Sequence, residues 1–157
     1  MVSEAQPVGT VGKCAGVVAL LILASVLSQA VRAEPAATAT EPGAIAIELN
    51  KLEMQGNQCR AYFVVTNKNA ANYKELKLDL VLFRPDGVIG RRFAVDLAPL
   101  KPNKRAVKLF ELADTACDDV GSFLINEVMS CQTDSGSVED CFDGIAVSSL
   151  AKAQLTK

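Results

Sequence analysis

The sequence of 157 residues contains no histidine and no tryptophan. Without histidine the chain cannot build Ser-His-Asp or Cys-His nucleophilic machinery, and it cannot hold zinc, copper or iron through imidazole ligands. The aromatic residues are two tyrosines and six phenylalanines, spaced singly along the chain rather than clustered as a platform for stacked bases. We therefore expect most of them to pack in a core.

A basic excess is also missing. Without residues 1–33 the chain keeps 14 basic and 17 acidic residues, a net charge of −3. Binding to a phosphate backbone needs a pronounced positive charge, so nucleic acid is not an expected partner. The 124 residues that remain are enough for one domain with its own core.

Residues 1–33 have the features of a secretion signal, although they contain neither a lipobox nor twin arginines. Lys13 lies in a polar stretch, residues 15–27 form an apolar run, and small or modest side chains precede the cleavage position after Ala33. We expect removal of this leader and export to the periplasm by the general route. The membrane would be a partner only through an uncleaved leader, because residues 15–31 are at the lower length limit for a bilayer span.

Three further segments follow the leader. Residues 34–43, EPAATATEPG, contain two prolines and otherwise mostly small side chains, which predicts a flexible linker. Residues 44–147 carry strand patterns and are predicted to form a β-sandwich domain. Residues 148–157 contain helix-forming residues without a clear apolar stripe, which predicts a frayed tail or a short helix.

Alternation of apolar and polar residues with a period of two dominates the predicted domain. It is cleanest in residues 76–82, where leucines occupy every second position. We therefore predict that Leu78 and Leu80 face the core, and that Lys77 and Asp79 face water.

Runs of this kind predict about seven strands in an all-β, antiparallel sandwich. The runs are residues 45–54, 59–66, 76–82, 93–97, 106–112, 123–129 and 145–147. The first run changes parity at Asn50 and Lys51, which predicts a bulge, and Gly90 is a second candidate. Residues 84–87, RPDG, suit a tight turn within an antiparallel hairpin. Both faces of the fifth and sixth runs are partly apolar, so their inward-facing residues are not assigned.

Removal of the leader would also remove Cys14. Four cysteines then remain, namely Cys59, Cys117, Cys131 and Cys141. An exported chain meets oxidising conditions, so two disulfides with three possible pairings are expected. Strands of alternating direction place Cys59 and Cys117 at one end of the sandwich. They place Cys131 at the other end, where Cys141 follows after a short polar loop. The predicted pairing is therefore Cys59 with Cys117 and Cys131 with Cys141.

Two other uses of the cysteines fit the spacing poorly. A zinc site of four cysteines usually contains a close pair, whereas the gaps here are 57, 13 and 9 residues. A redox-active pair would need a C-x-x-C motif, which the sequence does not contain.

Positive charge concentrates in the middle of the chain. Arg91, Arg92, Lys104 and Arg105 lie on neighbouring predicted hairpins, so they are a candidate patch for an acidic partner. The alternative is an ordinary solvated surface, in which lysines on edge strands guard against aggregation.

Acidic residues gather beside Cys117 and Cys141. Carboxylates on loops held by disulfides could bind calcium, although the spacing is not that of an EF-hand. The alternative, which we favour, is a set of exposed loop acids that keep the domain in solution. The residues concerned are Asp114, Asp118, Asp119, Asp134, Glu139, Asp140 and Asp143.

The segments IELNKLEMQGNQCRAYFVVTN, LKLDLVLFRPDGVIGRRFAVDLAPLKPNK and CDDVGSFLINEVMSCQ resemble a family of small exported proteins of alphaproteobacteria, labelled Tat-pathway signal proteins. The resemblance covers roughly residues 45–141, including the four cysteines and the PDG turn, whereas the leader departs from it by having no twin arginines. It implies the periplasm of a Gram-negative cell and transfers no active site. More loosely, the order of strands and turns is similar to immunoglobulin-like domains of the FxLYD type, which implies an immunoglobulin-like sandwich.

The function we predict from these observations is a non-catalytic periplasmic binding or accessory module that interacts with an envelope protein. Sandwich domains commonly act through surfaces, although a fold alone does not establish a function. No cofactor and no metal are expected, and the oligomeric state is not indicated. The alternative is a carboxylate-based hydrolase of envelope glycans, or an inhibitor of one, in which Asp118 and Asp140 supply the two acids.

Overall fold

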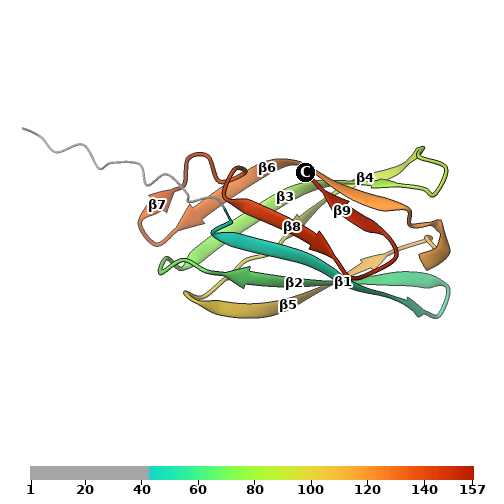
Figure 1. The fold of residues 1–157 in the computed structure, drawn as a ribbon, viewed down its shortest axis with the longest axis horizontal. Helices are drawn as coiled ribbons and strands as arrows, with labels where there is room; N and C mark the ends of the chain where they lie inside the picture. Colours follow the sequence, from blue (N-terminus) through green and yellow to red (C-terminus); the bar gives the residue numbers. More distant parts are fainter. Residues whose placement is uncertain (1–42) are drawn as a thin grey trace, which may run out of the picture. The chain divides into compact units, whose positions relative to one another are not determined.

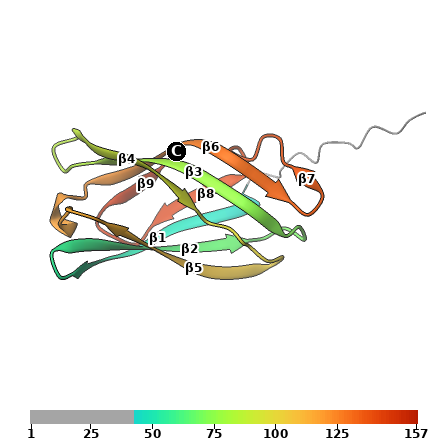
Figure 2. The same ribbon diagram turned by 180° about the vertical axis from the view of Figure 1, so that it is seen from behind.

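The computed structural model describes residues 43–157, which form two facing β-sheets (Figures 1 and 2). One sheet has the strand order β5-β2-β1-β8, and the other has the order β4-β3-β6-β7 with β9 also paired to β6. The strands are β1 (Ile45–Gln55), β2 (Gln58–Asn67), β3 (Tyr73–Phe83), β4 (Ile89–Asp96), β5 (Lys104–Leu112), β6 (Ser122–Thr133), β7 (Gly136–Ser137), β8 (Ile145–Ser149) and β9 (Gln154–Thr156), and the short 3₁₀ helix η1 (Cys117–Asp119) precedes β6. The predicted all-β sandwich is confirmed, with nine strands in the described part of the chain rather than about seven.

The connections between strands give the sandwich its immunoglobulin-like order. β1 and β2 form one antiparallel hairpin and β3 and β4 form another, while the chain crosses between the sheets after β2, β4, β5, β7 and β8. Such crossings are typical of immunoglobulin-like sandwiches. Two pairings depart from the predicted antiparallel pattern, because β8 runs parallel to β1 and β9 runs parallel to β6.

Irregular register bends several strands. The predicted bulges are confirmed, since Asn50 and Gly90 are each skipped in the pairing of their hairpins. Two further irregularities, which the alternation does not indicate, lie in β6, where the pairing with β3 skips Asn126 and Met129. They interrupt the alternation of β6, so that Asn126, Glu127 and Met129 are all exposed.

The core lies between the two sheets, and the leucines of β3 form part of it. Leu76, Leu78, Leu80 and Leu82 are at most 2% exposed, whereas Lys77 is exposed, as predicted. The aromatic residues also pack inward, with the ring of Phe123 lying 5.8 Å from that of Phe63 and 6.4 Å from that of Phe93, both edge-on. Edge-to-face contacts at these separations are favourable.

The C-terminal segment contributes to two strands, so the prediction of a frayed tail or short helix for residues 148–157 is wrong. Residues 148–149 complete β8, and the chain then switches sheets to form β9, seen in red in Figure 1. Ala153 and Leu155 are buried, and the Ser149 hydroxyl donates to the Ala153 carbonyl oxygen over 2.6 Å. Ala153 and Leu155 are two positions apart, which is the period of a strand. The apolar stripe of a helix has a different period, so its absence did not reveal this strand.

The predicted leader and, apart from Gly43, the predicted linker lie outside the described residues. Between residues 43 and 157 no helix combines the length and the apolar content that a membrane crossing requires.

Candidate binding groove along strand β6

The two predicted disulfides are confirmed. Cys59 is bonded to Cys117 with their Cα atoms 4.8 Å apart, which ties the start of β2 to η1. Cys131 is bonded to Cys141 with their Cα atoms 6.4 Å apart, which ties the end of β6 to the loop that precedes β8. Structural disulfides are typical of oxidising compartments, so the pair suggests an extracellular or periplasmic environment.

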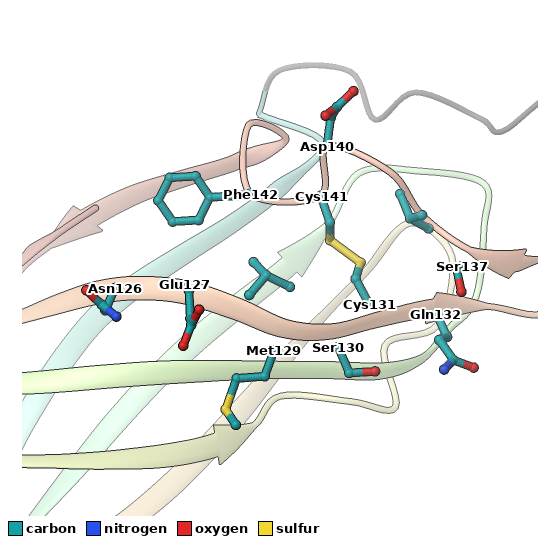
Figure 3. A pocket seen from close by; sticks show the side chains of 12 residues that line it. Asn126, Glu127, Met129, Ser130, Cys131, Gln132, Ser137, Asp140, Cys141 and Phe142 are labelled. Carbon is teal, nitrogen blue, oxygen red and sulfur yellow. A yellow bond between two sulfur atoms is a disulfide. The ribbon is translucent and has the colours of Figure 1, made fainter.

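A groove of about 590 Å³ follows β6 beside the second disulfide (Figure 3). One side consists of residues 126–132 of β6. The other side is formed by Ser137, Val138, Asp140, Cys141 and Phe142. The groove is thus confined to the C-terminal third of the chain.

The groove exists because one edge of β6 is paired only at its two ends. On one side β6 pairs with β3 along its length. On the other side β9 covers residues 122–124 and β7 covers residues 132–133. Residues 125–131 therefore have no strand partner on that side within the described chain, although the carbonyl oxygen of Cys131 accepts a hydrogen bond from the amide of Val138 there. At about 3.3 Å per residue, the unpaired edge is roughly 20 Å long.

The wall opposite β6 is held in place by several contacts. The Cys131–Cys141 disulfide anchors it, and the amide of Val138 donates to the carbonyl oxygen of Cys131 over 3.0 Å. The carbonyl oxygen of Asp140, a residue with a φ of 53°, accepts hydrogen bonds from the amides of residues 143 and 144, which closes a turn. The Lys157 ammonium lies 5.0 Å from the Phe142 ring centroid and donates to the Phe142 carbonyl oxygen over 2.9 Å. These contacts hold the groove open rather than collapsed.

Sequence reasoning missed this groove, although one signal pointed towards it. The alternation of residues 123–129 was ambiguous, and the structure explains why: β6 contains two extra residues, Asn126 and Met129, in a stretch without a partner on one side. Bulges are common at sheet edges, where they end or redirect pairing. The sequence signal for this edge was therefore the loss of regular apolar-polar alternation within residues 123–129.

Beside the groove, three strands contribute to a charged network around Asp79. Arg92 of β4 donates from Nε to both Asp79 carboxylate oxygens, over 2.7 and 2.8 Å, and Asn126 of β6 donates to Oδ2 over 2.8 Å. Arg92 also reaches the Glu127 carboxylate over 3.1 Å. The prediction that Asp79 faces water is wrong, because Asp79 is only 5% exposed. Its side chain projects from the outer face of β3, as the alternation requires, but side chains of both neighbouring strands cover it.

This network makes the stability of the domain depend on pH. The Arg92 guanidinium, together with Asn126, holds the pKa of the Asp79 carboxyl below its usual range. In the unfolded chain the pKa of that carboxyl is about 3.9, so the unfolded state takes up the proton first as the pH falls. The stabilisation by Asp79 is therefore complete above about pH 4 and is lost as the pH drops through the folded-state pKa.

Asp79→Asn removes the titrating group while keeping the shape of the side chain. We expect this variant to be less stable than the wild-type protein at neutral pH, with a difference that shrinks on acidification below about pH 4. Urea unfolding followed by circular dichroism over a pH series measures the difference. A difference that stays constant with pH would contradict the assigned role of Asp79.

The four basic residues predicted as one patch are not brought together. The Arg91 guanidinium donates to the Ala113 carbonyl oxygen over 2.9 Å, beyond the C-terminal end of β5, and Arg92 is engaged with Asp79. Lys104 and Arg105 begin β5, in the other sheet. At about 3.3 Å per residue, roughly 30 Å of strand separates Ala113 from Lys104. The single patch is therefore replaced by two separate sets of charges.

The predicted acidic residues are likewise divided between the two ends of the sandwich. Asp118 lies in η1 before β6 begins, whereas Asp140 follows the end of β6 beside the groove. From Ser122 to Cys131, which is bonded to Cys141 beside Asp140, β6 extends roughly 30 Å at about 3.3 Å per residue. Within residues 43–157, no three Asp, Glu or Cys side chains gather closely enough to hold a metal ion.

Comparison with known proteins gives little similarity. No family model matches the sequence, and no curated protein matches it. A solved structure of IrmA from Escherichia coli is similar in chain trace, with 14% sequence identity and a TM-score of 0.47 over 66% of this chain and 89% of that chain. Similarity at this level carries no information about function.

Proposed function

We propose that this protein is a non-catalytic binding module of the periplasm that takes an extended segment of an envelope protein into the groove along β6. The observation that carries the proposal is the edge of residues 125–131, which has no strand partner between β9 and β7 and whose backbone groups are open from residue 125 to residue 130. A strand edge with open backbone donors and acceptors is a template for another strand.

Strand addition suits the groove for two physical reasons. The backbone of an added strand supplies affinity through hydrogen bonds to the edge, while alternate side chains supply specificity. The wall is already held by the Cys131–Cys141 disulfide, so binding costs little ordering of the protein itself. Met129, which is 54% exposed, offers apolar contact beside the edge.

The location and the family belong to the same proposal. The leader pattern of residues 1–33 and the two disulfides support export into an oxidising compartment. The resemblance to the exported alphaproteobacterial family supports a Gram-negative periplasm. Cleavage after Ala33 would leave the domain with a short linker at its N-terminus.

The alternative, a carboxylate-based hydrolase, receives no support from the placement of its two acids. Paired carboxylates in glycosidases lie about 5 to 10 Å apart across the scissile bond. Asp118 and Asp140 are instead separated by the length of β6.

Photo-crosslinking in the periplasm tests the proposal. A photoreactive amino acid at position 129, in the groove, should give a discrete adduct with an envelope protein. The same amino acid at position 107, on β5, is the matched control, because Val107 is 58% exposed and lies away from β6. Hydrogen exchange on the purified complex should then show slowed amides in residues 125–131. Adducts from position 107 alone, or unchanged exchange along β6, would contradict the proposal.

A further inference from the structure

The groove lies in a part of the chain that carries negative charge only. Residues 109–151 contain nine aspartates and glutamates and not a single lysine or arginine. All the residues that line the groove come from this stretch. Two carboxylates, those of Glu127 and Asp140, are among them and are exposed.

The positive groups beside the groove leave this charge largely uncompensated. Lys77 of β3 lies opposite Ser130 of β6 and forms no ion pair within residues 43–157. Arg92 contacts Glu127 but is held mainly by Asp79. The ammonium of Lys157 is turned towards the Phe142 ring and carbonyl oxygen. No side chain of residues 43–157 forms an ion pair with the Asp140 carboxylate.

We infer that the segment which enters the groove is basic, an extended stretch of a partner protein with lysine or arginine at alternate positions. This inference rests on the proposed function and names the chemistry of its partner. Alternate side chains of an added strand lie on one face, about 7 Å apart. One of these basic residues can therefore meet Glu127, while the residues between them pack beside Phe142 and the disulfide, which line the groove in Figure 3. Opposite charges on neighbouring strands stabilise their pairing.

The groove has two other candidate occupants. One fits its negative charge poorly, and the other would be recognised by a different experimental result. Residues 34–42 of the chain itself carry two glutamates and two prolines, and proline cannot donate to a strand ladder. A second copy of the protein could present its β5 edge, which begins with Lys104 and Arg105. Such self-association would depend on protein concentration in the absence of any peptide.

Three capped heptapeptides serve as probes: alternating Lys and Val, alternating Thr and Val, and alternating Glu and Val. Each is added to the isotope-labelled domain, and binding is followed by amide hydrogen exchange and by titration. We expect the Lys peptide to slow exchange in residues 125–131 and to bind about tenfold more tightly than the Thr peptide, with the Glu peptide weakest. Added salt should reduce the advantage of the Lys peptide.

A double variant checks that the carboxylates of Glu127 and Asp140 cause the preference for the Lys peptide. Glu127→Gln with Asp140→Asn should bring the Lys peptide close to the affinity of the Thr peptide. The matched control, Asp114→Asn with Asp118→Asn, removes two exposed carboxylates at the other end of β6 and should leave the preference intact. Melting temperatures of both variants confirm that they remain folded.

The outcomes separate this inference from the proposed function. If all three peptides slow exchange along β6 with equal affinity, the basic partner is refuted while strand addition stands. If no peptide slows exchange in residues 125–131, the proposed function fails as well. Concentration-dependent protection of both β5 and β6 without peptide would identify a second copy as the occupant and overturn the inference.

Discussion

Replacing both Cys59 and Cys117 by alanine is expected to lower the free energy of unfolding by about 4 kcal/mol. The disulfide joins residues separated by 58 positions, so in the unfolded chain it closes a long loop and removes much of its conformational freedom. A loss of this size is comparable to the whole net stability of a small domain, about 5 to 15 kcal/mol. The variant should therefore be largely unfolded at moderate urea concentrations at which the wild-type protein remains native.

The second disulfide supplies the matched control. Cys131 and Cys141 are separated by only 10 positions, and by the same loop-entropy argument their double alanine variant should lose about 3 kcal/mol. Urea unfolding followed by circular dichroism measures both variants. A greater loss for the Cys131 and Cys141 pair would show that loop length does not govern these bonds.

Leu80→Ala is expected to cost about 2 to 5 kcal/mol of stability. Leu80 is 2% exposed and, with Ile47, Phe63 and Ile125, encloses a small cavity in the interior. Truncation removes buried apolar surface and enlarges that cavity, and both effects destabilise the folded state. The same unfolding experiment gives the cost.

Lys77→Ala is the control for this register, because Lys77 lies on the same strand but faces solvent. It should change the stability by no more than about 0.5 kcal/mol. Similar losses for Leu80→Ala and Lys77→Ala would mean that β3 does not bury its leucines. Asp79, which the alternation alone suggested as a neutral surface position, is unsuitable as a control because Arg92 and Asn126 bind it.

Features that depend on one strand and its direction were predictable from the residues. The inward leucines of β3 and the bulges at Asn50 and Gly90 follow from period-two alternation and its interruptions. The disulfide partners of Cys59 and Cys131 follow from the direction in which successive strands run. In each case the information lies within a few neighbouring residues or in the order of the strands.

Features that depend on which strands become neighbours were decided by the tertiary structure. Alternation places Asp79 on the outer face of β3, but only the sheet brings Arg92 and Asn126 over it from both sides. The separation of Arg91 from Lys104 arises because β4 and β5 join different sheets.

The groove is the clearest example of the second kind. It requires β9 and β7 to pair with the two ends of β6 while the segment between them stays unpaired. The sequence determined an all-β domain, its two disulfides and the inward leucines of β3, because these follow from local periodicity and chain direction. The tertiary structure decided the open edge, because pairing between distant strands depends on the packing of the whole sandwich rather than on any one segment.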